Sequence, residues 1–202
     1  MRITAILIAA GLSSRMQGPN KLLQPIVPGK TLIQHTFAAL QASTVDQLIV
    51  VTGRDADRVQ SSIVNCDLPI PEFVFNANFA LGMTTSIQAG LNEALDADAV
   101  MICLGDMPLL TSADYDALLT KFRENNRRDG IAAPFKEARK GNPVVFGAAH
   151  FQAIAEHTNM EGCASIIQAN QSHLIHLDTT SDHYFFDIDT PENLAEFKTR
   201  AQ

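Results

Sequence analysis

A short loop near the start of the chain carries two cations among small residues. The stretch LIAAGLSSRMQGPNKLL, residues 7–23, runs from apolar residues into a glycine and then holds Arg15 and, six residues later, Lys21. Backbone N–H groups in such a loop form an anion-binding concavity, and both cations can donate charge-assisted hydrogen bonds to phosphate. A P-loop is excluded, because its lysine directly follows the second glycine, whereas two residues separate Gly18 from Lys21. The loop predicts a polyphosphate site or, on composition alone, a turn with two solvated cations.

Carboxylates follow two later stretches of the chain. In AVMICLGDMPLLT, residues 99–111, Asp106 comes just after an apolar run, and in DIDTPENL, residues 187–194, Asp187 and Asp189 alternate along a predicted short strand and face the same side. Magnesium prefers oxygen ligands and is often shared between one or two carboxylates and substrate phosphates. Asp106 and one of the later pair therefore predict a Mg²⁺ site beside the polyphosphate. The other carboxylate could cap the following helix, and Asp106 could instead be a turn former.

Strand-like and helical segments alternate around these residues. Apolar runs typical of strands occupy residues 3–9, 47–53, 72–76, 99–105, 130–135, 142–147 and 173–178. Helical periodicity covers residues 31–43, 55–64, 84–95, 112–126 and 191–201. The alternation predicts an α/β fold whose mostly parallel central sheet is covered by helices on both faces. Short, closely spaced strands over 130–187 predict a small antiparallel excursion in the C-terminal half.

The ligand site of such a fold has a predictable place. In open α/β sheets, ligands bind outside the carboxyl ends of the strands. The segments AAGLSSR, TGRD, NANFALGMTTS and GDMP follow the first four predicted strands. We expect them to form the rim of one site.

Length and composition limit the classes of protein to which this chain can belong. A chain of 202 residues with 46% apolar and 18% charged residues suits a single domain over residues 1–202 and argues against disorder. The net charge of −7 argues against a nucleic-acid surface. Three widely spaced cysteines fit neither a disulfide framework nor a zinc site, and favour the reducing cytoplasm. With no second apolar run near 18 residues, we expect no membrane span.

Five motifs occur together and in order. They are LIAAGLSSRMQGPNKLL, GMTTSIQAGL (82–91), LGDMPLLT (104–111), KGNPVVF (140–146) and DIDTPENL. In this order and spacing the chain resembles the MobA/MocA-like nucleotidyltransferases of molybdenum cofactor biosynthesis, and is most similar to the molybdenum cofactor cytidylyltransferases. The resemblance implies one Rossmann-like, three-layer α/β/α domain that binds an NTP with Mg²⁺. It also implies transfer of the nucleotidyl group to a terminal phosphate of molybdopterin cofactor, with release of pyrophosphate.

The resemblance further implies roles for residues at matching positions. Those expected to contact the base or ribose are Ala9, Ala10, Gly11, Gly82, Thr84 and Ser86. Those expected to hold the triphosphate, and to carry catalysis together with Asp106, are Arg15 and Lys21. The expected Mg²⁺ ligands are Asp106 and Asp189, with Asp187 less favoured. The AAG start of the loop is closer to the cytidylyl than to the guanylyl branch, which favours CTP over GTP.

The segment NMEGCAS, residues 159–165, departs from the GDxGAR-like pattern of many cytidylyltransferase relatives. Met160 stands where an aspartate is usual, and Ala164 where an arginine is usual. The sequence therefore does not predict which contacts this segment makes with the acceptor. A sugar phosphate or an isoprenoid phosphate remains an alternative acceptor to molybdopterin cofactor.

Two other classes of function also remain open. A nucleotide-sugar glycosyltransferase is suggested by the literal DxD of residues 187–189, but such enzymes place that motif after a central strand. A non-catalytic chaperone would carry molybdenum cofactor to a target molybdoenzyme without nucleotidyl transfer. The joint presence of Arg15, Lys21, Asp106 and Asp189 argues against the chaperone, because binding alone would not need a metal set.

Overall fold

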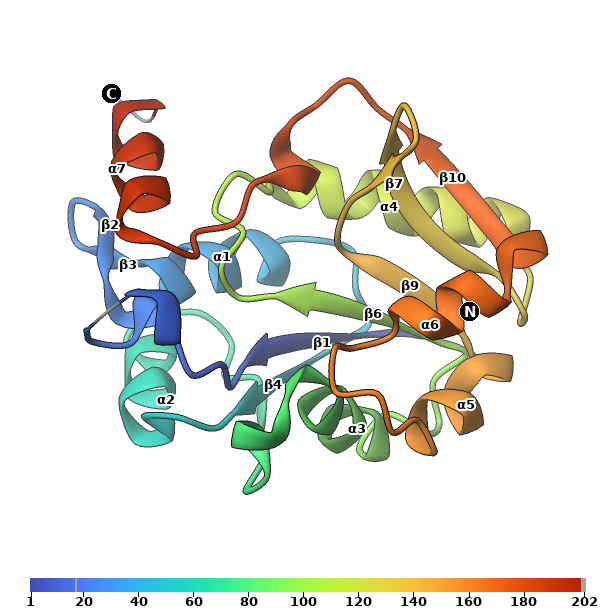
Figure 1. The fold of residues 1–202 in the computed structure, drawn as a ribbon, viewed down its shortest axis with the longest axis horizontal. Coiled ribbons are helices and arrows are strands. Elements are labelled where there is room, and N and C mark those ends of the chain that lie inside the picture. The colour runs from blue at the N-terminus through green and yellow to red at the C-terminus, as the bar shows by residue number, and fades with distance from the viewer. Residues whose placement is uncertain (17, 201–202) are drawn as a thin grey trace.

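A twisted sheet runs through the middle of the computed structural model, which describes residues 1–16 and 18–200 (Figure 1). Its main strands are β1 (Ile3–Ala9), β4 (Gln47–Thr52), β5 (Glu72–Phe75), β6 (Ala99–Leu104), β7 (Ile131–Lys136), β9 (Val144–Gly147) and β10 (Leu174–Asp178). They lie side by side in the order β5, β4, β1, β6, β9, β7, β10. Every one of them forms at a predicted apolar run.

Most strand pairs of the sheet are parallel. β1 pairs in parallel with both β4 and β6, β4 with β5, and β7 with β10. β9 runs antiparallel to both of its neighbours, β6 and β7. The two-residue strand β8 (Arg139–Lys140) adds a short antiparallel pair at the end of β7. The predicted α/β class is confirmed, and β8 and β9 are the antiparallel excursion.

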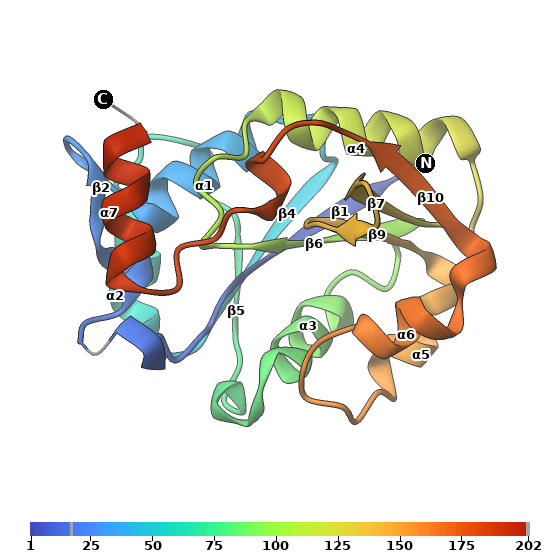
Figure 2. The same cartoon turned by 45° about the horizontal axis from the view of Figure 1, so that its top comes forward.

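Helices cover both faces of the sheet, which gives three layers. One face carries α1 (Leu32–Gln41), α2 (Ala56–Val64) and α4 (Ser112–Asn125), and the other carries α3 (Met83–Asn92), α5 (Phe151–Ala155) and α6 (Ala164–Ala169). Figure 2 shows α1 and α4 above the sheet and α3, α5 and α6 below it. None of the helices that the structure describes has both the length and the apolar character needed to cross a membrane.

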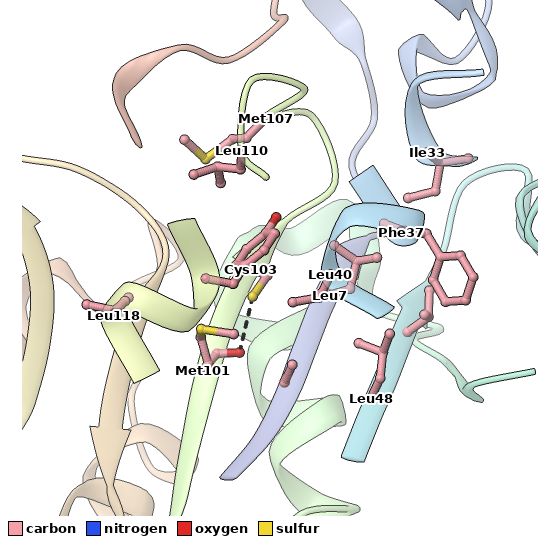
Figure 3. Close-up of a cluster of buried hydrophobic side chains, with 14 of the residues drawn as sticks. Leu7, Ile33, Phe37, Leu40, Leu48, Met101, Cys103, Met107, Leu110 and Leu118 are labelled. Carbon is pink, nitrogen blue, oxygen red and sulfur yellow. Dashed lines mark hydrogen bonds between the residues drawn. The ribbon is translucent and has the colours of Figure 1, made fainter. Parts of the chain in front are cut away.

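The core between the sheet and the first helical layer is built from apolar residues of both. Leu7 of β1 and Met101 of β6 point towards Phe37 and Leu40 of α1 and Leu118 of α4, and all five are fully buried (Figure 3). Burying each such side chain contributes about 1.5–3 kcal/mol to folding. This packing fixes the level at which β1 and β6 end, and therefore where the loops after them begin.

The C-terminal helix α7 (Pro191–Arg200) packs outside these layers. It lies beside the hairpin of β2 (Pro25–Val27) and β3 (Lys30–Thr31), which follows the two-cation loop (Figures 1 and 2). The hairpin was not predicted, nor were the short helices α5 and α6. Residue 201, the last of the helix predicted over 191–201, lies outside the described residues.

The predicted short strand through Asp187 and Asp189 is wrong. Residues 186–189 form no strand and join no sheet. Ile188 between the two carboxylates is fully buried, and its N–H donates to the carbonyl oxygen of Asp106 at 2.9 Å. The segment is therefore fixed to the loop after β6 by one backbone bond and one buried side chain, and the two carboxylates still lie on one side.

Candidate active site

A cleft of about 410 Å³ opens where β1 and β6 end. Of the residues predicted for the site, those that line it are Ala10, Gly11, Arg15, Lys21, Gly82, Ser86, Asp106 and Asp189. They come from the loop after β1, the start of α3, the loop after β6 and the segment before α7. The cleft therefore lies at the carboxyl ends of the strands, as predicted.

Two of the predicted base- or ribose-contacting residues do not line the cleft. Ala9 is the last residue of β1 and is fully buried in the core. Thr84 is also buried, and its hydroxyl donates to the carbonyl of Asn159 while accepting from the N–H of Gly162 at 3.0 Å. Thr84 thus ties residues 159–162 to the first turn of α3. The spacing of motifs could not show this, because its partners lie at least 75 residues away.

The two-cation loop is held by a buried amide. Asn20 is fully buried; its Oδ1 accepts from the N–H of Leu22 at 3.0 Å, and its Nδ2 donates to the carbonyl of Arg54 at 3.2 Å. Ser13, whose φ is +53°, accepts the N–H of Lys21 on its Oγ at 3.1 Å. A turn of merely solvated residues would not need these bonds. These bonds fix the conformation of the loop, and the structural role of Asn20 in it was not predicted from the sequence.

Lys21 joins two carboxylates that are remote in sequence. Its Nζ lies 2.5 Å from Oδ2 of Asp106 and 2.7 Å from Oδ1 of Asp189. Arg15 reaches the other oxygen of Asp189, at 2.8 Å. The Lys21 side chain is only 12% exposed and that of Arg15 is 68% exposed. The cluster therefore has one enclosed cation and one cation at the mouth of the cleft.

The protonation of the cluster follows from these contacts. Burial disfavours the charged form of Lys21, but Asp106 and Asp189 outweigh it and raise the pKa of the ammonium above its usual value. Burial likewise opposes ionisation of Asp189, yet hydrogen bonds from Lys21 and Asp187 hold its pKa below the usual range. At Asp187, burial, the hydrogen bond with Asp189 and the charge of Asp106 raise the pKa to about 6. Lys21 and Asp189 are thus charged at neutral pH, while Asp187 titrates just below it.

The three carboxylates suit a divalent cation. Asp106, Asp187 and Asp189 each offer an oxygen, and these oxygens lie within 4.8 Å of one another. Oδ1 of Asp106 is buried without a hydrogen-bond partner among the described residues, which is costly for a carboxylate oxygen unless a cation satisfies it. An all-oxygen set is the kind that Mg²⁺ or Mn²⁺ prefers. The geometry therefore places Asp187, the less favoured of the expected Mg²⁺ ligands, in one group with Asp106 and Asp189.

Neither carboxylate of the pair caps α7. Oγ1 of Thr190 accepts the N–H of Asn193 at 3.3 Å and supplies the cap. The expectation that one aspartate caps this helix is therefore wrong. Both aspartates remain free to face Asp106.

Binding of a divalent metal should depend on pH through Asp187. A carboxylate binds metal only when deprotonated. With a pKa of about 6, Asp187 is mostly protonated at pH 5 and mostly ionised at pH 7, so Mn²⁺ affinity should rise by up to about tenfold between these values. Titration calorimetry with Mn²⁺ at several pH values measures this. The Asp187→Asn variant should flatten the dependence over this range, and an equally steep dependence in the variant would contradict it.

The wall of the cleft at the start of α3 includes a position that only glycine fits. Gly82 has a φ of +136°, and a Cβ there would lie 2.5 Å from the carbonyl oxygen of Met160. Next to it, Met83 and Phe79 give the cleft an apolar side. Neither was singled out from the sequence, although both lie in the NANFALGMTTS segment predicted for the rim.

Ser86 is oriented by another buried amide. Nδ2 of Asn76 donates to Oγ of Ser86 at 2.9 Å, and Asn76 is only 5% exposed. Because the hydroxyl oxygen accepts from Asn76, its own proton remains available to an acceptor in the cleft. Asn76 acts through Ser86 rather than by lining the cleft, which is why its role could not be inferred from the motif.

The same chain matches a known family model. The model, described as MobA-like NTP transferase domain, matches residues 5–174. The matched range holds Arg15, Lys21 and Asp106, and ends before the aspartate pair. The bifunctional protein GlmU of Sinorhizobium medicae (strain WSM419) is 31% identical over 143 residues, which are 70% of this chain and 27% of that protein. The chain spans 27–38% of the length of the curated relatives it matches.

Solved structures share the fold. A nucleotidyl transferase from Methanothermobacter thermautotroptrophicus (Mth528) superposes with a TM-score of 0.83 at 20% identity, over 98% of this chain and 97% of that one. Rv0371c from Mycobacterium tuberculosis H37Rv, in complex with manganese, gives 0.70 at 20% identity over 98% and 99%. A CMP:2-keto-3-deoxy-manno-octonic acid synthetase complexed with CTP gives 0.77 at 16% identity over 100% and 98%. At these identities the likeness shows the Rossmann-like α/β architecture.

Proposed function

Because the chain belongs to the family of MobA-like NTP transferase domains, we propose that it transfers a nucleotidyl group from an NTP to a phosphate-bearing acceptor and releases pyrophosphate. CTP is the favoured nucleotide, Mg²⁺ the favoured metal, and molybdopterin cofactor the favoured acceptor. The observation that carries the proposal is the cluster in which Lys21 meets Asp106 and Asp189, with Arg15 beside it, at the carboxyl end of the sheet.

The reaction needs positioned cations more than a protein nucleophile. An oxygen of the acceptor phosphate forms a bond to the α-phosphorus, while the bond from that phosphorus to the oxygen bridging to the β-phosphorus breaks. The electron pair of the broken bond leaves with pyrophosphate. A phosphate is already ionised at neutral pH, so no general base is required. Catalysis then depends on orientation and on charge stabilisation, which Arg15 and Lys21 supply from the chain.

Asp106 and Asp189, with Asp187 beside them, would hold the divalent cation. When bound, that cation neutralises charge on the phosphates. Lys21 keeps Asp106 and Asp189 paired and close together. Rv0371c, which shares the fold, was solved in complex with manganese, and this supports a divalent metal in the proposed reaction.

The other end of the cleft suits the nucleoside. Ala10 and Gly11 leave room for close approach, Phe79 and Met83 offer apolar contact, and Ser86 presents a hydroxyl proton. CTP is supported by the AAG start of the loop and by the structural neighbour that was solved with CTP. The cleft thus offers one charged end and one largely apolar end, as a nucleoside triphosphate requires.

A pyrophosphate-release assay tests the proposal. The protein is incubated with Mg²⁺, each NTP in turn, and a panel of molybdopterin cofactor, sugar phosphates and isoprenoid phosphates. We expect the fastest release with CTP and molybdopterin cofactor. Release only with a sugar or isoprenoid phosphate would reassign the acceptor. No release with any pair, together with tight binding of molybdenum cofactor, would instead support the chaperone.

Replacing Arg15 with alanine should slow nucleotidyl transfer while leaving the fold intact. Loss of one charge-stabilising group costs about 2–4 kcal/mol in the transition state. The side chain is 68% exposed, so the free energy of unfolding should hardly change. Steady-state pyrophosphate release measures the rate. Arg58→Ala is the matched control, because Arg58 is 66% exposed, pairs with Asp55 and does not line the cleft. Equal rates in the two variants would mean that Arg15 has no part in catalysis.

A further inference from the structure

A second cavity adjoins the cleft. It measures about 200 Å³ and lies on the α3 and α6 side of the sheet, with apolar walls from residues such as Ile87, Val144 and Phe146. Met83 and Leu104 line both this cavity and the cleft. The two spaces therefore share a wall, and a molecule in one lies next to a molecule in the other.

Lys140 brings a positive charge into this mostly apolar space. It is the last residue of β8 and is partly buried. Its Nζ donates to the carbonyl oxygen of Gly141 at 3.0 Å, and among residues 1–16 and 18–200 no carboxylate lies within 4.0 Å of it. An ammonium has three donors, so two of those on Lys140 have no acceptor in the part of the chain that the structure describes. Lys136 on the same hairpin differs, since it pairs with Asp182 at 2.6 Å.

The backbone around Lys140 is firmly placed. The N–H of Gly141 donates to the carbonyl of Pro134 at 2.9 Å, and that of Asn142 to the carbonyl of Tyr184 at 3.0 Å. A Cβ on Gly141 would lie 2.6 Å from the carbonyl oxygen of Tyr184, so the close approach requires glycine. Lys140 thus extends from the end of a strand whose following residues are fixed by backbone hydrogen bonds.

The other ionisable groups of the cavity do not neutralise Lys140. Burial raises the pKa of the Cys163 thiol to about 12, so the thiol is uncharged at neutral pH. Glu161 is exposed to solvent on the rim. Burial lowers the pKa of Lys140, which reflects the cost of holding this charge without a counterion. A bound anion would remove that cost.

We propose that this cavity receives the acceptor and that Lys140 binds an acidic group of it, so that the acceptor is a phosphorylated molecule with an apolar or flat body. This inference rests on the proposed function. The nucleophile must approach the α-phosphorus from a side that the nucleotide does not fill, and the wall of Met83 and Leu104 is where the second cavity meets the nucleotide cleft. One cation against apolar walls selects for an anionic group attached to an apolar body.

Phenyl phosphate is a suitable probe, because it joins a phosphate to a flat apolar ring. Protein loaded with Mg²⁺ and a non-hydrolysable CTP analogue is titrated with phenyl phosphate and, separately, with phenol by calorimetry. We expect the wild type to bind phenyl phosphate and to bind phenol at least tenfold more weakly. Lys140→Met should weaken phenyl phosphate binding at least tenfold, and Lys140→Arg should restore part of it.

The matched control is Lys136→Met, which removes a cation from the same hairpin at an exposed ion pair. It should bind phenyl phosphate like the wild type. All variants should bind the CTP analogue equally. Equal phenyl phosphate affinity in Lys140→Met and wild type, or no binding to the wild type, would overturn the inference.

The test separates this inference from the proposed function. If the wild type fails to bind any NTP analogue, the proposed function fails, and phenyl phosphate titration of the nucleotide-free protein still decides whether Lys140 binds an anion. If Lys140→Met unfolds, as shown by circular dichroism, Lys140→Gln replaces it. With an active acceptor in hand, Lys140→Met should raise the KM for that acceptor and leave the KM for the NTP unchanged.

Discussion

Replacing Asp106 with asparagine is expected to lower nucleotidyl transfer by about 10³-fold, the largest effect of any single exchange in the cleft. Its Oδ2 accepts from Lys21 at 2.5 Å, and its buried Oδ1 has no hydrogen-bond partner among the described residues. Asparagine keeps the shape but removes the charge that a divalent cation requires. The rate of pyrophosphate release and the Mn²⁺ affinity measured by calorimetry should therefore both fall.

The control for this exchange is another aspartate that forms a short ion pair with a lysine. Asp182 lies 2.6 Å from Lys136 and is 64% exposed, away from the cleft. Asp182→Asn should keep the rate and metal affinity of the wild type. If Asp106→Asn did so as well, Asp106 would have no part in catalysis or metal binding.

Replacing Lys21 with methionine should impair both activity and stability. Loss of an enclosed cation beside the phosphates should slow transfer by about 10²–10³-fold. Without the ammonium, Asp106 and Asp189 lose the cation that they share in a largely enclosed site, which should cost about 3 kcal/mol of unfolding free energy in metal-free protein. Both carboxylate side chains are less than one fifth exposed, so water screens them little.

Added metal distinguishes the two effects of the Lys21 exchange. A divalent cation bound to the carboxylates supplies the charge that the lysine gave, and binding only to the folded state stabilises it by mass action. Urea unfolding with chelator and with Mg²⁺ should therefore show a larger metal-induced gain in Lys21→Met than in the wild type. The same stability for variant and wild type in chelator would mean that the ion pairs contribute nothing to the fold.

The layout of the sheet could be read from the sequence because its central strands leave little ambiguity. Runs such as LIVV and VMICL are apolar throughout, which is typical of strands covered on both faces, and they lie between helical patterns of ordinary length. The short helices α5 and α6 have five and six residues, too few for periodicity to reveal. Residues 187–189 alternate like a strand but have no strand neighbour to pair with.

That the charged residues of the candidate site lie together was also predictable, whereas the residues that support them were not. Arg15, Lys21, Asp106 and Asp189 stand in loops after predicted strands or before a predicted helix, where chemistry is expected. Asn20, Asn76 and Thr84 act through hydrogen bonds to other segments of the chain, and only the folded structure shows which. The same limit applies to Lys140, whose lack of a carboxylate partner is a property of its surroundings.

The ion pair between Lys21 and Asp189 spans 168 positions of the chain. A contact between residues so far apart in sequence is entropically unfavourable before the sheet has formed, because a long loop must be closed to make it. The cluster of Lys21, Asp106 and Asp189 is therefore expected to form late in folding, and no shorter stretch of the chain contains it. A nucleotide or metal ion that binds there contacts residues from both ends of the chain. Because these residues come together only in the folded protein, the binding free energy stabilises the whole fold.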